Sequence, residues 1–241
     1  MKKSMSILSI LISGLIFLNL FTAPVSAKDE AENNTNNEKV IYLTFDDGPG
    51  GKVTIEVLDI LKKENVPATF FLIGDQIKGQ EETLKRMHEE GHSLGLHSMT
   101  HKKSTLYSSN EAFLKEMLDD QKTINDAVGI SPTILRFPFG CNNTRYHLKK
   151  ELVDLLHENH LKIYDWNVDT TDGANHNASP STYIKNAKSD KETVMLLMHC
   201  GYMNKNSAKA LPEIIKYYKE KGYTFKPITD ETEEIFKFMK K

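Results

Sequence analysis

Short apolar runs alternate with longer amphipathic stretches from about residue 40 to the end of the chain. ATFFLIG (68–74) is apolar at nearly every position, which indicates a strand that is covered on both faces. The stretches between such runs carry apolar residues at helical spacing, as Ile55, Leu58 and Leu61 do. Strands that alternate with helices predict a parallel sheet covered by helices. The fold class is therefore α/β, with the sheet either open or closed into a barrel.

The same patterns place the individual elements. SSNE (108–111) fits a capping box that opens a long helix, and Gly91 suits the end of an earlier one. We expect strands at residues 40–45, 68–74, 92–97, 133–137, 161–168, 193–199 and 223–225, and helices at residues 54–66, 81–91, 108–128, 146–159 and 208–221.

The first 27 residues have the pattern of a secretory signal peptide. Lys2 and Lys3 give a positive start, an apolar run covers about residues 7–21, and Val-Ser-Ala ends at Ala27. An uncleaved membrane anchor is the alternative, because the run is about long enough to span a thin bilayer. The small residues before the cleavage site favour a signal peptide at residues 1–27, and therefore a secreted, extracellular or wall-associated protein.

Residues 28–38 (KDEAENNTNNE) carry almost no apolar side chains, so we expect a flexible linker. Residues 39–241 then form one domain, with no stable membrane span after signal cleavage and no indication of more than a monomer. The whole chain has a net charge of −2, which becomes −4 when Lys2 and Lys3 leave with the signal peptide. So small and evenly spread a charge does not favour a nucleic-acid partner.

The two cysteines, Cys141 and Cys200, are too few for a disulfide framework. We expect two separate buried thiols. A disulfide between them is the alternative, and it would need their Cα atoms to lie within about 7 Å.

Polar residues stand at the ends of five expected strands. A single histidine at a strand end is more often a hydrogen-bonded surface or core residue than a functional one. The carboxyl ends of parallel strands meet at one edge, however, so several such residues predict a common site. The residues are Asp46, Asp47, His97, His101, Arg136, Asp169, Asp172 and His199.

His97 and His101 are spaced so that two imidazoles can bind one cation from one side. Two imidazoles and one carboxylate suit Zn²⁺, although Fe²⁺, Co²⁺ or Ni²⁺ would accept the same ligands. Three protein ligands leave a position for water, whose pKa the metal lowers towards about 7. The spacing alone is a weak signal, and the carboxylate pair at the first strand end strengthens it.

Asp46 and Asp47 end the run IYLTFDDGP, and neighbouring strand residues point to opposite faces. We therefore expect one carboxylate to bind the metal and the other to take a proton from the water. Arg136 is expected to form a two-pronged ion pair with the free carboxylate. His199, kept charged by a neighbouring carboxylate, is expected to protonate the leaving group.

The chain resembles the polysaccharide deacetylases, the NodB-homology group or carbohydrate esterase family 4. The motifs are TFDDGP (44–49), HSMTH (97–101), RFPFG (136–140), WNVDTTDG (166–173) and LLMH (196–199), in the family's order. The resemblance covers the chain from residue 38 onward and implies a distorted (β/α) barrel with fewer than eight complete repeats.

The resemblance also implies a role for each matching residue. Asp46 would be the general base, Asp47, His97 and His101 the metal ligands, Arg136 the residue that holds the base, Phe139 a main-chain oxyanion donor, His199 the general acid, Asp172 the residue that tunes it, and Leu197 the wall of the acetyl pocket.

The implied reaction is hydrolysis of an N-acetyl group on a glucosamine-type sugar of peptidoglycan or a chitin-like polysaccharide. A metal-bound water would attack the acetamide without a covalent enzyme intermediate, and Zn is the expected metal, with Co or Ni as alternatives. Two other functions stay open: an O-acetyl esterase of the xylan type, and a wall-associated protein without catalysis.

Two positions depart from the family pattern. Phe139 replaces a frequent Tyr, which matters little if only its main-chain N–H acts. Gly173 stands where the family usually has Trp, so we expect a groove wall that is more open or differently filled. Trp166 is expected to be a core residue rather than a substitute for that indole, and Asp169 competes with Asp172 as the partner of His199.

Overall fold

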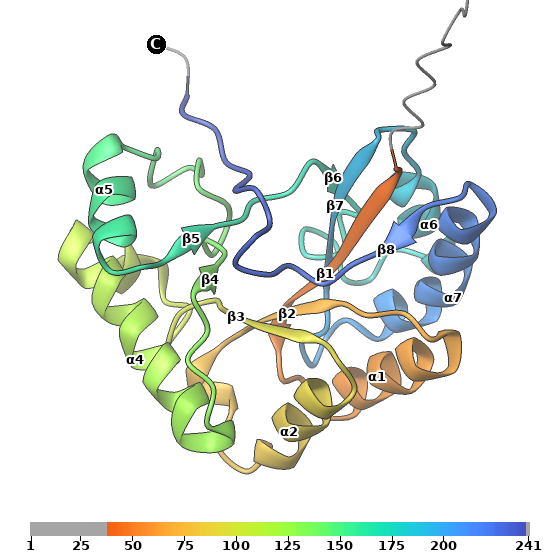
Figure 1. The fold of residues 1–241 in the computed structure, drawn as a ribbon, viewed down its shortest axis with the longest axis horizontal. Helices are drawn as coiled ribbons and strands as arrows, with labels where there is room; N and C mark the ends of the chain where they lie inside the picture. Colours follow the sequence, from red (N-terminus) through yellow and green to blue (C-terminus); the bar gives the residue numbers. More distant parts are fainter. Residues whose placement is uncertain (1–37, 240–241) are drawn as a thin grey trace, which may run out of the picture. The chain divides into compact units, whose positions relative to one another are not determined.

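The computed structural model describes residues 38–239. Its strands β1 to β8 form one sheet, in which each strand pair is parallel. The strands lie in the order β5-β4-β3-β2-β1-β7-β6, and β8 pairs with the start of β1. Figure 1 shows this sheet curling on itself, and its end strands β5 and β6 are not paired with each other. The strands are β1 (Val40–Gly48), β2 (Thr69–Leu72), β3 (Ser93–Leu96), β4 (Ile134–Leu135), β5 (Lys162–Ile163), β6 (Val168–Asp169), β7 (Thr193–His199) and β8 (Thr224–Phe225). The predicted distorted barrel is confirmed.

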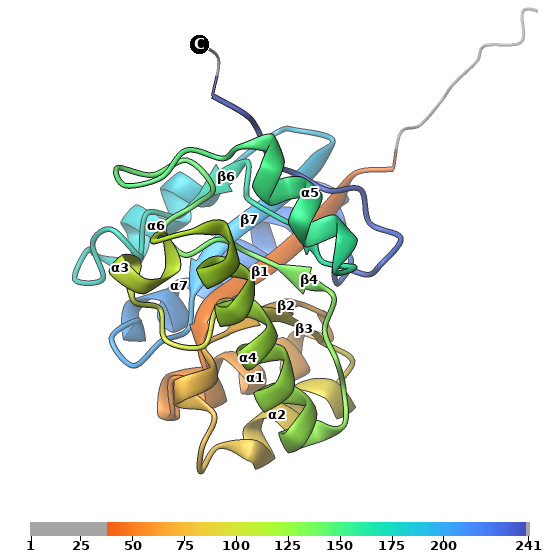
Figure 2. The same ribbon diagram turned by 90° about the vertical axis from the view of Figure 1, so that its left-hand side faces the viewer.

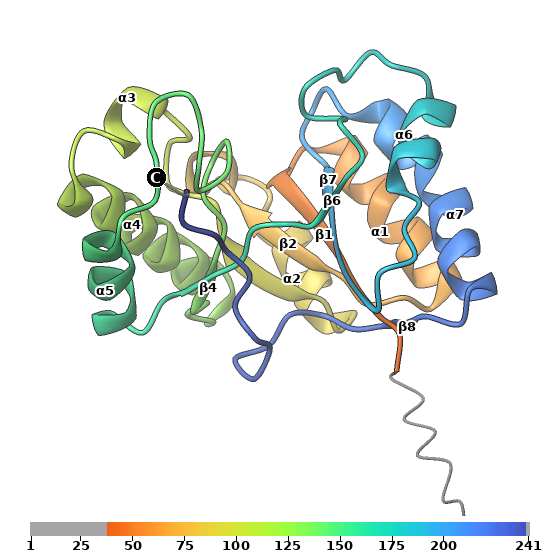
Figure 3. The same ribbon diagram turned by 90° about the horizontal axis from the view of Figure 1, so that it is seen from above.

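Helices lie around the outside of the curled sheet, α4 and α5 on one flank and α6 and α7 on the other (Figures 2 and 3). They are α1 (Lys52–Glu64), α2 (Glu81–Glu89), α3 (Lys103–Leu106), α4 (Asn110–Val128), α5 (Lys150–Glu158), α6 (Pro180–Ala187) and α7 (Lys205–Glu220), with a 3₁₀ turn η1 (Gly74–Gln76) after β2. The apolar stripes of these helices pack against the outward side chains of the strands and form the main core.

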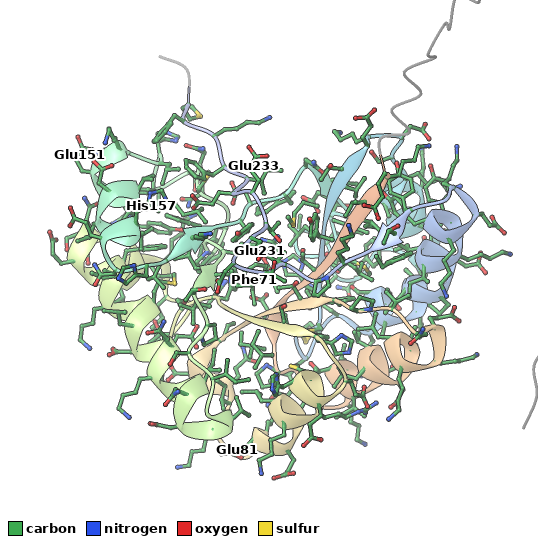
Figure 4. All side chains as sticks on the ribbon, in the orientation of Figure 1. Phe71, Glu81, Glu151, His157, Glu231 and Glu233 are labelled. Carbon is green, nitrogen blue, oxygen red and sulfur yellow. The ribbon has the colours of Figure 1, made fainter. Side chains whose placement is uncertain are left out.

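A second, smaller cluster fills the inside of the curl. Its side chains come from strands or strand ends that are far apart in the sheet, so they can touch only on the concave side. Phe71, which is labelled near the centre of Figure 4, belongs to it. The members are Phe71, Ile134, Tyr164, Met195 and Ile228. This cluster fills the interior of the curl with side chains.

The segment after β8 runs back along the open side of the sheet. Ile235 pairs with Tyr164 just beyond β5, and the Asp165 N–H donates to the Ile235 carbonyl at 2.7 Å. The phenol of Tyr164 donates to the carbonyl of Thr232 at 2.7 Å. The last part of the chain therefore covers the gap beside β5.

Several predicted elements differ from the observed ones. The strand expected at 161–168 is divided into β5 and β6. Between them the Tyr164–Ile235 bridge and the hydrogen bond from the Asp165 N–H to the Ile235 carbonyl join the chain to the C-terminal segment. The helix expected from residue 146 begins at Lys150, and α6 was not predicted. The N-cap of α4 is Ser109, whose side chain accepts the N–H of Ala112 at 3.1 Å.

The predicted signal peptide (1–27) and all but the last residue of the predicted linker (28–38) lie outside the described residues. Within residues 38–239, no helix combines the length and apolar character that a membrane crossing requires.

Candidate active site

The polar strand ends gather around one cavity of about 310 Å³ at the carboxyl edge of the sheet. The parallel pairing of β1 with β7 sets Asp46 opposite His199, so two of the groups meet through backbone register alone. The lining residues are Asp46, Asp47, His97, His101, Phe139, Trp166, Asp169, Gly173, Ala174, Leu197 and His199. Arg136 and Asp172 are fully buried behind this lining.

Asp47, His97 and His101 face one another in a group that can hold a metal ion. Oδ1 of Asp47 lies 3.5 Å from Nε2 of His97 and 3.4 Å from Nε2 of His101. The three ligand atoms all lie within 4.8 Å of one another. Oδ1 of Asp47 is buried and has no hydrogen-bond partner among residues 38–239. A buried carboxylate oxygen without a donor, turned towards two imidazoles, fits a cation at this place.

His97 is prepared to act as a neutral ligand. Its Nδ1 lies 3.0 Å from the main-chain oxygen of Arg136, which fixes the ring and leaves Nε2 directed at Asp47. Burial, followed by the nearby His101, lowers the pKa of His97 to about 3. The imidazole is therefore uncharged at neutral pH, as metal binding requires.

The loop that carries both imidazoles is held by two carboxylates of α4. Asp120 accepts the N–H of His97 at 3.0 Å. Glu116 accepts both the N–H of Thr100 at 2.8 Å and its hydroxyl at 3.0 Å. Neither acid was identified from the sequence, since on a helix both look like ordinary polar positions. Their contacts connect the long helix directly to the proposed metal ligands.

Arg136 holds Asp46, but it does not form the expected two-pronged pair. Nη1 alone reaches Oδ1 of Asp46, at 2.9 Å, and it also donates to the hydroxyl of Thr44 at 2.6 Å. Nε and Nη2 donate to the carbonyls of Tyr164 and Asp165 at 2.8 and 3.1 Å. The guanidinium is fully buried, so its remaining donors must be satisfied by main-chain oxygens.

Oδ2 of Asp46 is left without a hydrogen bond among the described residues, and it lies 3.8 Å from Nε2 of His97. The side chain is only 4% exposed. One oxygen of this carboxylate is thus fixed by Arg136. The other faces the group of possible metal ligands, Asp47, His97 and His101 (the metal group), and can accept a proton there.

His199 and Asp172 form a close pair. Nδ1 of His199 lies 2.8 Å from Oδ1 of Asp172, and the His199 N–H donates to Oδ2 at 2.8 Å. Ser207 donates a further hydrogen bond to Oδ2, at 2.6 Å. Burial opposes the charged imidazole, but the hydrogen bond and charge of Asp172 outweigh it and raise the pKa of His199 to about 9. The ring is therefore protonated at neutral pH.

Asp169 does not compete for this imidazole. Its Oδ1 accepts the N–H of Thr171 at 2.6 Å, which ties the carboxylate to its own loop. Of the two acids that the sequence left open, Asp172 is the one that contacts His199.

Phe139 and Leu197 stand at the cavity wall. Phe139 has a φ of 67°, in the left-handed region, and its ring is 47% exposed beside His101, with ring centroids 4.7 Å apart. No hydrogen bond within residues 38–239 uses the Phe139 main-chain N–H. Leu197 is buried in β7 and contributes an apolar surface. The cavity wall thus offers the free main-chain donor of Phe139 and the apolar surface of Leu197.

The expectation for Trp166 needs correction, and Gly173 makes a contact that the sequence did not indicate. Trp166 is half-buried and lines the cavity, so it is not a plain core residue. At Gly173 a Cβ would lie 2.4 Å from Cε1 and 2.6 Å from Nε2 of His199. No side chain fits there while the loop keeps this path. Gly173 therefore does more than leave a groove wall unfilled, because its bare backbone lies against the His199 ring.

The cysteines are free and buried, so the expectation of two separate thiols is confirmed. Cys141 donates to Oδ2 of Asp165 at 2.7 Å, and Cys200 lies behind Asp46, with its Sγ 3.7 Å from that residue's main-chain oxygen. Burial raises the pKa of Cys141 to about 12, which leaves it uncharged and unreactive at neutral pH.

Comparisons with known proteins agree with this geometry. A family model described as polysaccharide deacetylase matches residues 33–160. The chain is 38% identical over 208 residues to a peptidoglycan-N-acetylglucosamine deacetylase of Bacillus cereus, covering 83% of this chain and 72% of that protein. It is 35% identical to one of Listeria monocytogenes over 207 residues, which are 86% of this chain and 42% of the other. The crystal structure of a polysaccharide deacetylase from Bacillus cereus superposes with a TM-score of 0.74 at 37% identity, over 81% of this chain and 95% of that one.

Proposed function

The chain belongs to the polysaccharide deacetylase family, and from that premise we propose that it removes N-acetyl groups from the N-acetylglucosamine residues of cell-wall peptidoglycan. One observation carries the proposal: Asp46 is fixed by Arg136, while the adjacent Asp47 turns an unpartnered oxygen towards two imidazoles. The substrate is the one in the names of the Bacillus and Listeria relatives.

We assign Asp47, His97 and His101 as the ligands of a divalent cation, which for this ligand set is Zn²⁺, with Co²⁺ or Ni²⁺ as alternatives. When bound, such an ion supplies Lewis acidity, which polarises a carbonyl oxygen and lowers the pKa of a water molecule. The neutral state of His97 and the unpartnered oxygen of Asp47 support this assignment.

Asp46 is the general base of the proposed reaction. Its free Oδ2 faces the metal group and takes the proton of the attacking water, while Arg136 keeps the carboxylate from rotating. Both side chains are buried, so bulk water does not screen the charge of Asp46, and its electrostatic interaction with the substrate is stronger.

The acetamide would be oriented by the cavity wall. The free N–H of Phe139 donates to the oxygen on which negative charge develops, and Leu197 packs against the acetyl methyl group. A tetrahedral intermediate then loses the sugar amine when His199 gives its proton to the nitrogen. Asp172 keeps that proton available, because it holds the pKa of His199 at about 9.

We also propose that residues 1–27 are a secretory signal and residues 28–38 a linker to the catalytic domain, so that the enzyme meets its substrate outside the cell. The mature protein recovered from medium or wall fractions would then begin near Lys28. N-terminal sequencing decides this, and recovery of protein that still starts at Met1 would contradict it.

Acetate release tests the activity directly. We expect the protein to release acetate from peptidoglycan and from chitin oligomers, to lose this activity with a chelator and to regain it with Zn²⁺. Release from acetylated xylan alone would indicate an O-acetyl esterase. Binding to wall material with no acetate from any substrate, even with added metal, would indicate a non-catalytic protein.

Asp46→Asn provides the matched variant, since the amide keeps the size of the carboxylate but cannot accept the proton. We expect turnover to fall by at least about 100-fold while bound metal, measured by elemental analysis, stays unchanged. An Asp46→Asn protein with unaltered turnover would remove Asp46 as the base.

A further inference from the structure

The loop after β4 makes a tight turn at the cavity wall. The N–H of Gly140 donates to the carbonyl of Phe137 at 2.9 Å, so these residues are the ends of a four-residue β-turn. Pro138 occupies the second position, and Phe139, with a φ of 67°, the third. Proline followed by a residue of positive φ is typical of a type II turn. Glycine usually takes that third position, because the left-handed region is unfavourable for other residues.

The direction of the central peptide distinguishes the two common turn types. A type I turn has a negative φ at the third position, and its central peptide is flipped relative to that of a type II turn. Here the central peptide joins the carbonyl of Pro138 to the N–H of Phe139, the proposed oxyanion donor. A flip to type I would relieve the positive φ of Phe139 and reverse the direction of its N–H. The aromatic residue at this position therefore favours the orientation in which the donor is lost.

The phenol of Tyr107 opposes this flip. It donates a hydrogen bond to the carbonyl oxygen of Pro138 at 2.6 Å. The peptide between Pro138 and Phe139 is trans, so its carbonyl and its N–H point in opposite directions. The Phe139 N–H thus points away from Tyr107, and Phe139 lines the site cavity whereas Tyr107 does not. A flipped peptide would lose the bond to Tyr107, which therefore stabilises the observed turn.

Tyr107 follows α3 and is itself fixed by neighbouring rings. It stacks on Tyr146 with ring centroids 5.0 Å apart, and it lies against Phe113 with ring centroids 5.9 Å apart. Burial raises the pKa of Tyr107, so its phenol stays protonated and remains a donor. A hydrogen bond to the carbonyl also polarises the peptide, which makes the N–H at its other end a stronger donor.

We propose that Tyr107 is a positioning residue for the deacetylation: its phenol holds the Pro138–Phe139 peptide so that the Phe139 N–H stays free for the oxyanion. The inference rests on the proposed function, which gives this N–H its role. Negative charge on the acetamide oxygen develops only in the transition state. The contribution of Tyr107 should therefore appear in kcat, and not in the binding of metal or substrate.

Tyr107→Phe removes only the hydroxyl and tests this directly. We expect kcat on a chitin tetramer to fall about tenfold, as for one lost hydrogen bond, with KM and the dissociation constant of Zn²⁺ unchanged. Tyr146→Phe is the matched control, because it removes a hydroxyl from the stacked ring that makes no hydrogen bond to residues 136–140. Its kcat should equal that of the wild type. Equal losses of kcat in both variants would overturn the inference, since the cause would be ring packing.

A glycine background separates orientation from packing. Phe139→Gly removes the cost of the positive φ, because glycine adopts it readily, so the turn should keep its type without the bond to Tyr107. Adding Tyr107→Phe to Phe139→Gly should then lower kcat by no more than about twofold. A full tenfold loss in this background would contradict the inference.

Crystal structures of the wild type and of Tyr107→Phe report the peptide orientation without any turnover. We expect a positive φ at Phe139 in the wild type, and a negative φ or a mixture of both in the variant. A positive φ alone in both proteins would overturn the inference, whether or not the wild type releases acetate. A flipped peptide in the variant of a protein that releases no acetate would support the action of Tyr107 on the turn and count against the proposed function alone.

Discussion

The backbone of Gly173 lies against the imidazole of His199, and this contact decides what the position can accept. We expect Gly173→Ala to displace the ring and lower kcat by at least about tenfold, because proton transfer depends on placement. Gly173→Trp, which restores the residue common in the family, should be worse. Rates on a chitin tetramer measure both, with Asn175→Ala in the same loop as the control. A Gly173→Trp enzyme faster than the wild type would show that the loop moves to admit the indole.

If His199 is the general acid, its pairing with Asp172 should set the alkaline limb of the pH profile. Because the pKa of His199 is about 9, the proposed acid stays protonated until the pH passes that value. Asp172→Asn removes the charge that opposes burial, so the limb should move from about pH 9 to pH 6.5 or below. A profile of kcat/KM against pH checks this. An alkaline limb that stays in place would assign it to another group.

Helix α4 reaches the metal group through Glu116, which accepts two hydrogen bonds from Thr100 in the ligand loop. Glu116→Ala should weaken Zn²⁺ binding by about 10- to 100-fold, the usual cost of losing a support behind metal ligands. Competition with a chelator gives the dissociation constant. Asp119→Ala removes an exposed acid of the same helix that is paired with Lys115, and it should leave the dissociation constant of Zn²⁺ unchanged. If both variants lost Zn²⁺ affinity equally, the loss would come from a less stable helix and not from the contact between Glu116 and Thr100.

Elements were predictable from the sequence where their signals are local. Apolar runs marked β1, β2 and β7, and serine before a run of helix formers marked α4. The strand expected at 161–168 failed because Tyr164 pairs with Ile235, a partner far along the chain that no local pattern shows.

The same limit explains the site. Residue types at strand ends were enough to select Asp47, His97 and His101. Whether Arg136 pairs by one nitrogen or two depends on which carbonyls surround it, and these come from the loop after β5. The position of Trp166 in the cavity depends on that loop too.

At the scale of the whole molecule, the inner cluster connects the C-terminal segment to the curled sheet. Ile228 is 1% exposed and packs in the inner cluster with Phe71 of β2 and Met195 of β7. Ile228→Ala should lower the free energy of unfolding by about 2–5 kcal/mol, because it leaves a cavity. Ile55→Ala, at a position 37% exposed, should cost clearly less. Urea denaturation of both variants gives the comparison, and equal losses would show that the segment adds little.

The register that sets Asp46 opposite His199 has a consequence for biosynthesis. Asp46 and His199, the two groups that would move protons, lie on β1 and β7, which are far apart in the sequence. They come together only when these two strands pair. If both groups act as proposed, a nascent polypeptide would remain inactive until β7 has paired with β1. Truncated translation products that stop before β7 would then release no acetate.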